Sequence, residues 1–210
     1  MYIPDAFAVT DPAEIAALLG GARLAVLVTH GAEGLFATHL PLIHDAAAGT
    51  LNGHMARTNP HRARAGDGEA LVIVQGVEAY VSPSFYPAKA EHGRVVPTWN
   101  YEVVHVHGRL TWHEEADWLH ANVAALTDRF EAGREPPWAL ADAPESYVAG
   151  MLRAIVGVEL AITRVEAKRK LSQNRGEADR AGVIEGLAAS PREGDRAVAA
   201  AMAEIGRAHV

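Results

Sequence analysis

The chain contains no cysteine, and this absence removes several kinds of chemistry at once. Disulfides, thiolate metal sites, iron–sulfur clusters and cysteine nucleophiles are all excluded. No run of about 18 apolar residues is present that could cross a membrane, and the start Met1-Tyr2-Ile3-Pro4-Asp5 lacks the basic-then-apolar pattern of a signal peptide. We therefore expect a cytoplasmic protein that has no membrane segment.

The sequence motifs of several common ligand sites are also missing. The chain has neither the G-x-G-x-x-G of dinucleotide sites nor the G-x-x-x-x-G-K-[ST] of P-loops, and it lacks the G-x-S-x-G of many serine hydrolases. We therefore do not expect a Rossmann site, a P-loop or a Ser-His-Asp hydrolase.

Positive charge is scarce as well. The net charge is −7, with 19 Lys and Arg against 26 Asp and Glu, so the whole chain lacks the basic surface of a protein that binds nucleic-acid backbones. The charge is uneven, because residues 1–163 carry −9 and residues 164–210 carry +2. A basic tail of this kind suits the phosphate of a cofactor or of a nucleic acid.

The pattern that is present is mostly that of β-strands. Alternating apolar residues predict strands at residues 24–29, 35–44, 50–55, 71–80, 99–112 and 156–162. Helices are expected at residues 12–20, at residues 118–130 and 147–155, and as a pair after Arg175. Because short turns join the strands, the predicted fold class is α+β with mainly antiparallel β-structure, a barrel with peripheral helices.

We expect two parts along this chain. Residues 1–165 form the barrel domain, and residues 166–210 form a basic loop and C-terminal helices that pack on the barrel or on a dimer partner. Within the strand at residues 71–80, Gln75-Gly76 interrupts the apolar run and predicts a β-bulge.

Four segments could bind a ligand, and each has a plainer alternative. Thr38-His39 precedes Pro41 in mid-strand, which is also typical of an ordinary edge strand. Residues 52–61 lead from a strand into a helix start that could seat an anion, although many capped helices look the same. Residues 80–101 are rich in aromatic and small polar side chains, which suits a flat ligand or simple loop packing. The basic residues 168–175 suit a phosphate or a solvated loop.

His105-x-His107 could in principle ligate a metal from one face of a strand. No carboxylate on that face completes a ligand set, so we favour a hydrogen-bonded histidine face and expect no metal site.

Taken together, these segments resemble the PaiB-like family, described as FMN-binding negative transcriptional regulators. The matching segments, in chain order, are Met1-Tyr2-Ile3-Pro4, Ala37-Thr38-His39-Leu40-Pro41-Leu42, Gly53-His54-Met55-Ala56-Arg57-x-Asn59-Pro60, Tyr80-x-Ser82-Pro83-Ser84-x-Tyr86, Val96-Pro97-Thr98-Trp99-Asn100-Tyr101 with Val104-His105-Val106-x-Gly108, and Lys170-Leu171-Ser172-Gln173-Asn174-Arg175. Phe85 departs from the pattern, since tryptophan is common there in the family.

The resemblance implies an FMN-binding split barrel that forms a homodimer, with FMN in grooves between the two subunits. It places Thr38, His39, Leu40 and Pro41 along the isoalloxazine edge, and it places His54, Ala56 and Asn59 at the ribityl chain or phosphate. By the same analogy Trp99 and Asn100 close the ring side. The implied phosphate or dimer-groove contacts of the tail are Lys170, Ser172, Gln173 and Arg175.

Three functions are compatible with this resemblance. The first is an FMN-binding protein that acts as a flavin-dependent oxidoreductase or flavin reductase, with NAD(P)H or another small redox partner; the flavin does the chemistry, and no residue stands out as a catalytic acid or base. The second is a negative transcriptional regulator, although the net charge disfavours direct DNA contact. The third is haem binding, because related barrels accept haem and this chain has 11 histidines.

Overall fold

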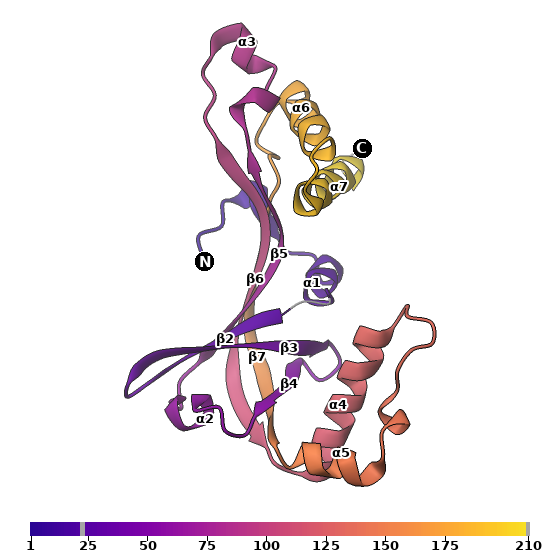
Figure 1. Cartoon of the computed structure of the whole chain (residues 1–210). Helices are drawn as coiled ribbons and strands as arrows, with labels where there is room; N and C mark the ends of the chain where they lie inside the picture. The colour runs from indigo at the N-terminus through magenta and orange to yellow at the C-terminus, as the bar shows by residue number, and fades with distance from the viewer. Residues whose placement is uncertain (22–23, 209–210) are drawn as a thin grey trace. The chain divides into compact units, whose positions relative to one another are not determined.

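The structure is a computed structural model that describes residues 1–21 and 24–208, with side chains through Ile205 (Figure 1). The strands are β1 (Ala8–Val9), β2 (Leu24–Gly31), β3 (Gly34–Asp45), β4 (Thr50–Ala56), β5 (Ala70–Val81), β6 (Thr98–His113) and β7 (Ile155–Lys170). The α-helices are α1 (Pro12–Leu19), α2 (His61–Arg64), α3 (Ala88–His92), α4 (Ala116–Glu131), α5 (Glu145–Leu152), α6 (Glu177–Ala188) and α7 (Glu193–Ala208). Short 3-10 turns are η1 (Asp5–Phe7), η2 (Pro83–Phe85) and η3 (Leu140–Asp142).

The strands form one antiparallel sheet in the order β1-β7-β4-β3-β2-β5-β6. A further pairing of β7 with β6 joins the last strand of this order to the second, which closes six strands into a barrel. The structure therefore confirms the predicted fold class, mainly antiparallel α+β with peripheral helices. Within the described residues, no helix combines the length and the apolar character needed to cross a bilayer.

The expected strands and helices are present with small differences at their ends, and one difference is large. The sequence predicted the last strand to end near Ile162, and the prediction was wrong because β7 continues to Lys170. Its basic end is stabilised by distant partners: Lys168 Nζ donates to Tyr101 Oη at 2.8 Å, and Arg169 Nε donates to Glu102 Oε1 at 2.7 Å. The basic segment therefore begins as a strand and becomes a loop only after Lys170.

The chain divides into two compact units that are each discontinuous in sequence. Unit 1 comprises Met1–Asp11, Gln75–Val104 and Glu166–Val210, and unit 2 comprises Pro12–Val74 and His105–Val165. The strands β5, β6 and β7 each contribute residues to both units. The division into a barrel at 1–165 and a tail at 166–210 stays a prediction.

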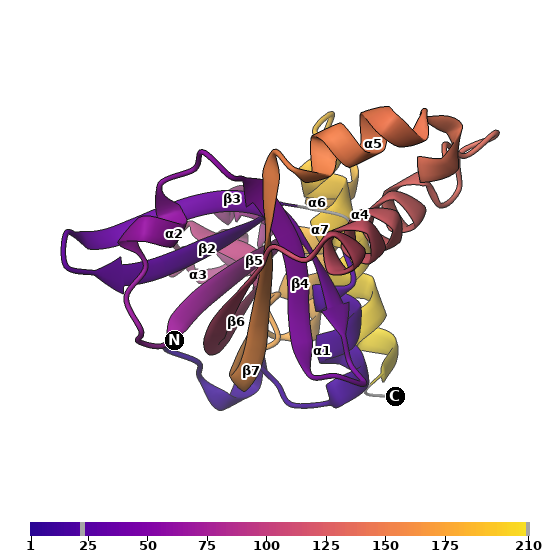
Figure 2. The ribbon, with the colours of Figure 1, turned by 90° about the horizontal axis from the view of Figure 1, so that it is seen from below.

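Unit 2 contains the β2–β3–β4 meander, and α4 packs on β3 and β4 with α5 beside it (Figure 1, Figure 2). In β2 the register pairs Val26 with His39 and Val28 with Ala37, so alternate residues face opposite sides of the sheet. The inward side of this unit is apolar. Its buried side chains include Leu27, Leu40, Leu51, Met55, Val72, Leu119, Val158 and Leu160.

Unit 1 has a second apolar core, formed where α6 and α7 pack on strand residues. The two helices lie side by side in Figure 1. The buried members of this core are Ala79, Val81, Tyr86, Leu171, Val183, Leu187, Val198, Ala199, Ala201 and Met202. The predicted helix pair after Arg175 is thus held by its own apolar face.

The buried face of β5 changes at the position where the sequence predicted a bulge. Even-numbered residues are buried through Val74, whereas Ala79 and Val81 are buried beyond it. Gly76 lies within this change, and a Cβ there would come 2.5 Å from the Cβ of Glu102, so no larger residue fits without movement. A shift of one residue in the alternation is the effect that an inserted residue has on a strand.

Candidate functional site

Thr38 on β3 is the centre of a hydrogen-bonded polar cluster in unit 2. Its Oγ1 lies 2.7 Å from His61 Nδ1 and accepts from Asn59 Nδ2 at 3.3 Å. Asn59 Oδ1 accepts from the backbone N–H of His61 at 2.9 Å, so Asn59 supports the start of α2. Two of the predicted site residues, Thr38 and Asn59, are therefore in contact.

His61 is the residue of this cluster that the predicted site did not include. Its side chain is 0% exposed, and its Nε2 lies 3.0 Å from Thr29 Oγ1. The Phe36 ring meets it edge-on at 5.1 Å. Burial lowers the pKa of His61, so the neutral ring is favoured and each nitrogen has a hydroxyl partner that can donate or accept. The position of His61 just after Asn59-Pro60, at a helix start, marks it as a candidate in the sequence. Only the fold shows that both nitrogens of its ring have a hydroxyl partner.

The other predicted residues of β3 divide between its two faces. Leu40 is buried on the inward face, whereas His39 is exposed on the outward face and Pro41 is half-buried. His39 pairs with Val26 of β2 in the register. A ligand on one side of the sheet can therefore contact the side chains of Thr38 and Leu40, or those of His39 and Pro41, but not both pairs.

His54 and Ala56 lie on the face of β4 that α4 covers. Alternate residues of a strand point to the same side, so Asn52, His54 and Ala56 share this face. Asn52 pairs with Ile43 of the neighbouring strand β3. The His54 ring is half-buried, and Asn122 Nδ2 of α4 lies 3.2 Å from its Nδ1. Burial lowers the pKa of His54, so the ring is uncharged at neutral pH and brings no positive charge for a phosphate.

The junction between β4 and α2 has two arginines, Arg57 and Arg62. Arg57 Nη1 donates to Glu114 Oε2 at 2.8 Å, and Arg62 Nη1 donates to the other oxygen, Glu114 Oε1. These bonds and charges hold the pKa of the Glu114 carboxyl below its ordinary value. In this arrangement both guanidinium groups are engaged by one carboxylate rather than left for an anion.

In unit 1, Asn100 and Ser172 bind one another in the interior. Asn100 is 0% exposed; its Nδ2 donates to Ser172 Oγ at 3.0 Å and contacts Met202 Sδ at 3.3 Å. Ser172 has a left-handed backbone with φ 64°, which is uncommon for a residue with a side chain. Gln173 closes the same turn, since its Oε1 accepts from the Leu171 N–H at 2.7 Å. These predicted residues fix the turn after β7.

An aromatic and cationic face lies on the opposite side of these unit 1 strands; it consists of Tyr80, Trp99, Tyr101, Lys168 and Lys170. Trp99 is 52% exposed and packs edge-on against Tyr80 with ring centroids 6.1 Å apart. Lys170 Nζ donates to Thr98 Oγ1 at 2.8 Å and to the Trp99 carbonyl. The buried Lys168 Nζ lies 5.1 Å from the Tyr101 ring centroid. Lys168 belongs to this face and is not among the site residues that the family resemblance implies.

Positive charge is concentrated around Lys170. Burial, and then the charges of Lys168 and Arg175, lower the pKa of the Lys170 amine. The Arg175 guanidinium also lies 5.1 Å from the ring centroid of Tyr86. A bound anion would relieve the repulsion among these cations.

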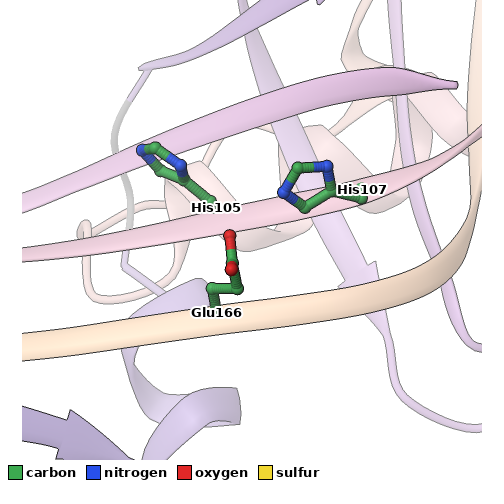
Figure 3. Close-up of side chains that lie close together, drawn as sticks. All are labelled: His105, His107 and Glu166. Atoms are coloured by element: carbon green, nitrogen blue, oxygen red, sulfur yellow. The ribbon is translucent and has the colours of Figure 1, made fainter. Parts of the chain in front are cut away.

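His105 and His107 project from one side of β6, as the sequence predicted (Figure 3). His107 Nδ1 lies 3.5 Å from Glu69 Oε2, within unit 2. Glu166, which Figure 3 labels on β7, binds the N-terminal amine of Met1 at 2.8 Å within unit 1. His107 therefore has a polar partner, and the expectation that this face binds no metal stays a prediction.

Residues 1–164 match the family model described as "Putative FMN-binding domain". The chain belongs to this FMN-binding family. A relative in Bacillus subtilis, named protease synthase and sporulation protein PAI 2, is 34% identical over 190 residues. The match covers 89% of this chain and 89% of that protein. An uncharacterized protein of Aspergillus fumigatus is 35% identical over 176 residues, which are 68% of this chain and 67% of that protein. The family confirms the PaiB-like resemblance, and FMN is its cofactor.

Solved structures confirm the fold. The flavocytochrome Anf3 from Azotobacter vinelandii superposes with a TM-score of 0.59 at 14% identity, covering 83% of this chain and 74% of its own. The FAD and heme binding protein from Mycobacterium smegmatis gives 0.57 at 20% identity, covering 78% of this chain and 73% of its own. The barrel is therefore a split barrel of the flavin-binding type.

The side chains of this chain fit an FMN molecule in kind. A planar ring system asks for exposed aromatic surface, and a phosphate asks for nearby cations. Trp99 and Tyr80 offer the first, and Lys170 with its cationic neighbours offers the second.

Proposed function

We propose that this protein is a flavin-dependent oxidoreductase that works as a homodimer. The observation that carries the proposal is the aromatic and cationic face of unit 1, in a chain whose net charge is −7. Two lysines of one strand lie there beside an exposed indole, with Lys170 bound to the Trp99 carbonyl. Such a combination suits a nucleotide that has one flat ring system and one phosphate.

The residues proposed to hold FMN are those that the family resemblance implies. In unit 2, the β3 segment of Thr38, His39, Leu40 and Pro41 is proposed to run along the ring edge, which its backbone and the side chains of one face can contact. His54, Ala56 and Asn59 serve the ribityl chain or phosphate. The uncharged His54 suits a ribityl hydroxyl better than the phosphate. In unit 1, the proposed contacts are Trp99, Asn100, Lys170, Ser172, Gln173 and Arg175.

These unit 1 contacts differ in kind. Lys170 and Arg175 supply charge, and Trp99 supplies ring surface. Asn100 and Ser172 are buried, so they act by fixing the turn that carries Gln173 and Arg175.

FMN, when bound, supplies the hydride or electron transfer. The protein binds and orients it, and its hydrogen bonds and charges tune it. No side chain is proposed as catalytic acid or base. NAD(P)H or another small redox partner is the proposed electron donor.

The proposed dimer contact is the outward face of β2, β3 and β5 in unit 2. Leu24 is 61% and Leu35 is 75% exposed, and the register places Val26, Val28 and Ala37 on the same side. His30 and His39 lie on this side as well, so the face is mainly apolar with two imidazoles. Exposed apolar side chains gathered on one face of a sheet are typical of an interaction surface. A second copy of the chain would bury this face and would bring a second set of FMN residues.

The alternative left open by the sequence, regulation of transcription by direct DNA contact, finds less support. The apolar face of α7 is buried in the core of unit 1, and the first turns of α6 and α7 carry Glu177, Asp179, Glu193 and Asp195. Acidic side chains at helix starts repel the DNA backbone.

The experiment that tests the proposal is reconstitution with FMN. The purified protein is incubated with excess FMN and desalted, and retained flavin is counted by absorption while light scattering gives the mass. We expect about one FMN per chain in a particle of two chains, and bleaching of the oxidised flavin band when NADPH or NADH is added without oxygen.

The matched variant is Lys170→Met, which keeps the length of the side chain and removes its charge. It should retain at least tenfold less FMN, whereas Lys89→Met, at an exposed lysine that binds Ser84 Oγ, should retain as much as the wild type. Absence of retained FMN in the wild type, or a flavin that neither donor reduces, would overturn the proposal.

A further inference from the structure

Unit 2 contains an apolar cavity that the proposed FMN contacts do not explain. It has a volume of about 250 Å³ and lies between β4, α4 and the segment that includes η3 and α5. Its walls include Val123 from α4, Leu152 from α5 and Ile155 from the start of β7. Nearly all of the lining surface is carbon, so the cavity favours a ligand that needs no hydrogen bonds.

Large apolar side chains remain exposed at the mouth of this cavity. Trp138 is 46% exposed, Tyr147 61% and Met151 46%, and all three line it. Leaving such side chains in water costs roughly 25 cal/mol for each Å² of apolar surface. Exposed apolar groups around a hollow are typical of a binding site rather than of a plain surface.

The cavity also lacks charge. Among the residues that the structure describes, none with an acidic or permanently basic side chain lines it. Its one imidazole, His54, has Asn122 Nδ2 at 3.2 Å from Nδ1, and burial lowers the pKa of this ring so that it stays neutral. An ionic ligand would lose its hydration here without gaining an ion pair.

The size and the walls narrow the ligand further. An apolar protein cavity of about 150 Å³ can hold benzene, so the larger cavity of this protein suits about two fused rings. The indole of Trp138, the phenol of Tyr147 and the thioether of Met151 are all favourable neighbours for an aromatic ring.

We propose that this cavity binds a small, uncharged aromatic molecule of about two fused rings. The cavity lies close to the predicted flavin segment on one strand, because His54 and Ala56 are on the same face of β4, two residues and roughly 7 Å apart. The proposed function assigns His54 and Ala56 to the ribityl chain or phosphate, so the cavity would adjoin that end of the flavin. The position relative to the flavin rests on the proposed function, whereas the binding itself does not.

The test uses 2-naphthol, which is uncharged at pH 7, titrated into the full-length protein by calorimetry with and without FMN. We expect one binding site per chain in both forms. Met151→Glu places a carboxylate at the mouth of the apolar cavity and should weaken binding of 2-naphthol at least tenfold. We expect the variant to fold, because Met151 is 46% exposed. Ala149→Glu adds the same charge to an exposed position of α5 outside the cavity, and it should change the affinity less than twofold.

The possible failures are distinguishable. If 2-naphthol does not bind at millimolar concentration while FMN is retained, the cavity inference is wrong and the proposed function stands. If 2-naphthol binds but FMN is not retained, the proposed function is wrong and the cavity inference stands. Equal weakening by both variants would overturn the inference, and so would a Met151→Glu protein that changes its mass in light scattering, since a second chain would then occupy the cavity.

Discussion

At the scale of single residues, the sequence identified polar groups but not their partners. Thr38 and Asn59 were predicted as site residues, yet the contact that fixes Thr38 comes from His61, which is buried with a hydroxyl on each ring nitrogen. Lys168 was predicted only as part of a basic segment, and its burial against Tyr2 and Tyr101 depends on residues far away in sequence. Pairings of this kind are set by strand register, which one sequence does not contain.

His61 gives a prediction about stability and its pH dependence. His61→Ala removes the ring between Thr29 and Thr38 and leaves two hydroxyls without their partner, so we expect a loss of about 3 kcal/mol in the free energy of unfolding. Because burial lowers the pKa of His61 in the folded protein, the unfolded chain binds more protons as the pH falls through 6.5. The wild type should therefore lose stability below that pH, and the variant should lose less. Burial lowers the pKa of His54 as well, so the variant will keep part of the pH dependence of its stability.

Urea unfolding between pH 5 and pH 8 measures both effects. The control is His120→Ala at an exposed position of α4, with an expected change below about 0.5 kcal/mol in the free energy of unfolding. An identical pH slope in the wild type and in His61→Ala would show that the buried ring does not titrate as described.

At the scale of secondary-structure elements, the alternation of apolar residues was sufficient for most strands and helices. β6 follows the prediction along its length, with Val104, Val106 and Gly108 buried between more exposed neighbours. β7 was predicted too short because Lys168 and Arg169 interrupt the apolar pattern, and their charges are compensated only in the folded protein. Charged residues that are buried by pairing look like a loop in sequence.

The packing of α6 gives the prediction at this scale. A Cβ at Gly182 would lie 2.2 Å from the carbonyl oxygen of Phe85, and backbone cannot move aside as a side chain can. Gly182→Ala should therefore destabilise the protein by about 2 kcal/mol, although alanine is favoured over glycine in helices by about 1 kcal/mol.

Thermal unfolding compares this variant with Gly194→Ala on α7. A Cβ at Gly194 meets only the Glu78 carbonyl oxygen, at an ordinary 3.6 Å, so this substitution should be neutral or slightly stabilising. If Gly182→Ala raised the melting temperature as well, helix propensity rather than close packing of η2 on α6 would govern this contact.

At the scale of the whole molecule, composition and motif order identified the family and the fold class. The expected boundary near residue 165 stays a prediction. The contacts group the chain into two units that are each assembled from distant segments, and such a grouping depends on strand pairing that a single sequence does not contain.

The dimer gives the prediction at this scale. Leu35→Lys adds a charge to the outward face of β3, where the side chain is 75% exposed in one chain. We expect light scattering to show a single chain instead of two, with a loss of retained FMN. Tyr147→Lys, at a position on α5 that is 61% exposed, should leave the mass unchanged. If the Leu35→Lys protein still forms dimers, the dimer contact does not lie on this face.

The placement of the lysines has a consequence for covalent labelling. The chain has three lysines, and two of them lie on the end of β7. Lys168 is almost completely buried and is shielded from acylating reagents, whereas Lys89 reacts as an ordinary exposed amine. Lys170, with its lowered pKa, holds a larger share of its amine as the nucleophilic free base. Among the three lysines, Lys170 is therefore expected to be the most reactive, and the ligand proposed to bind there would protect it from modification.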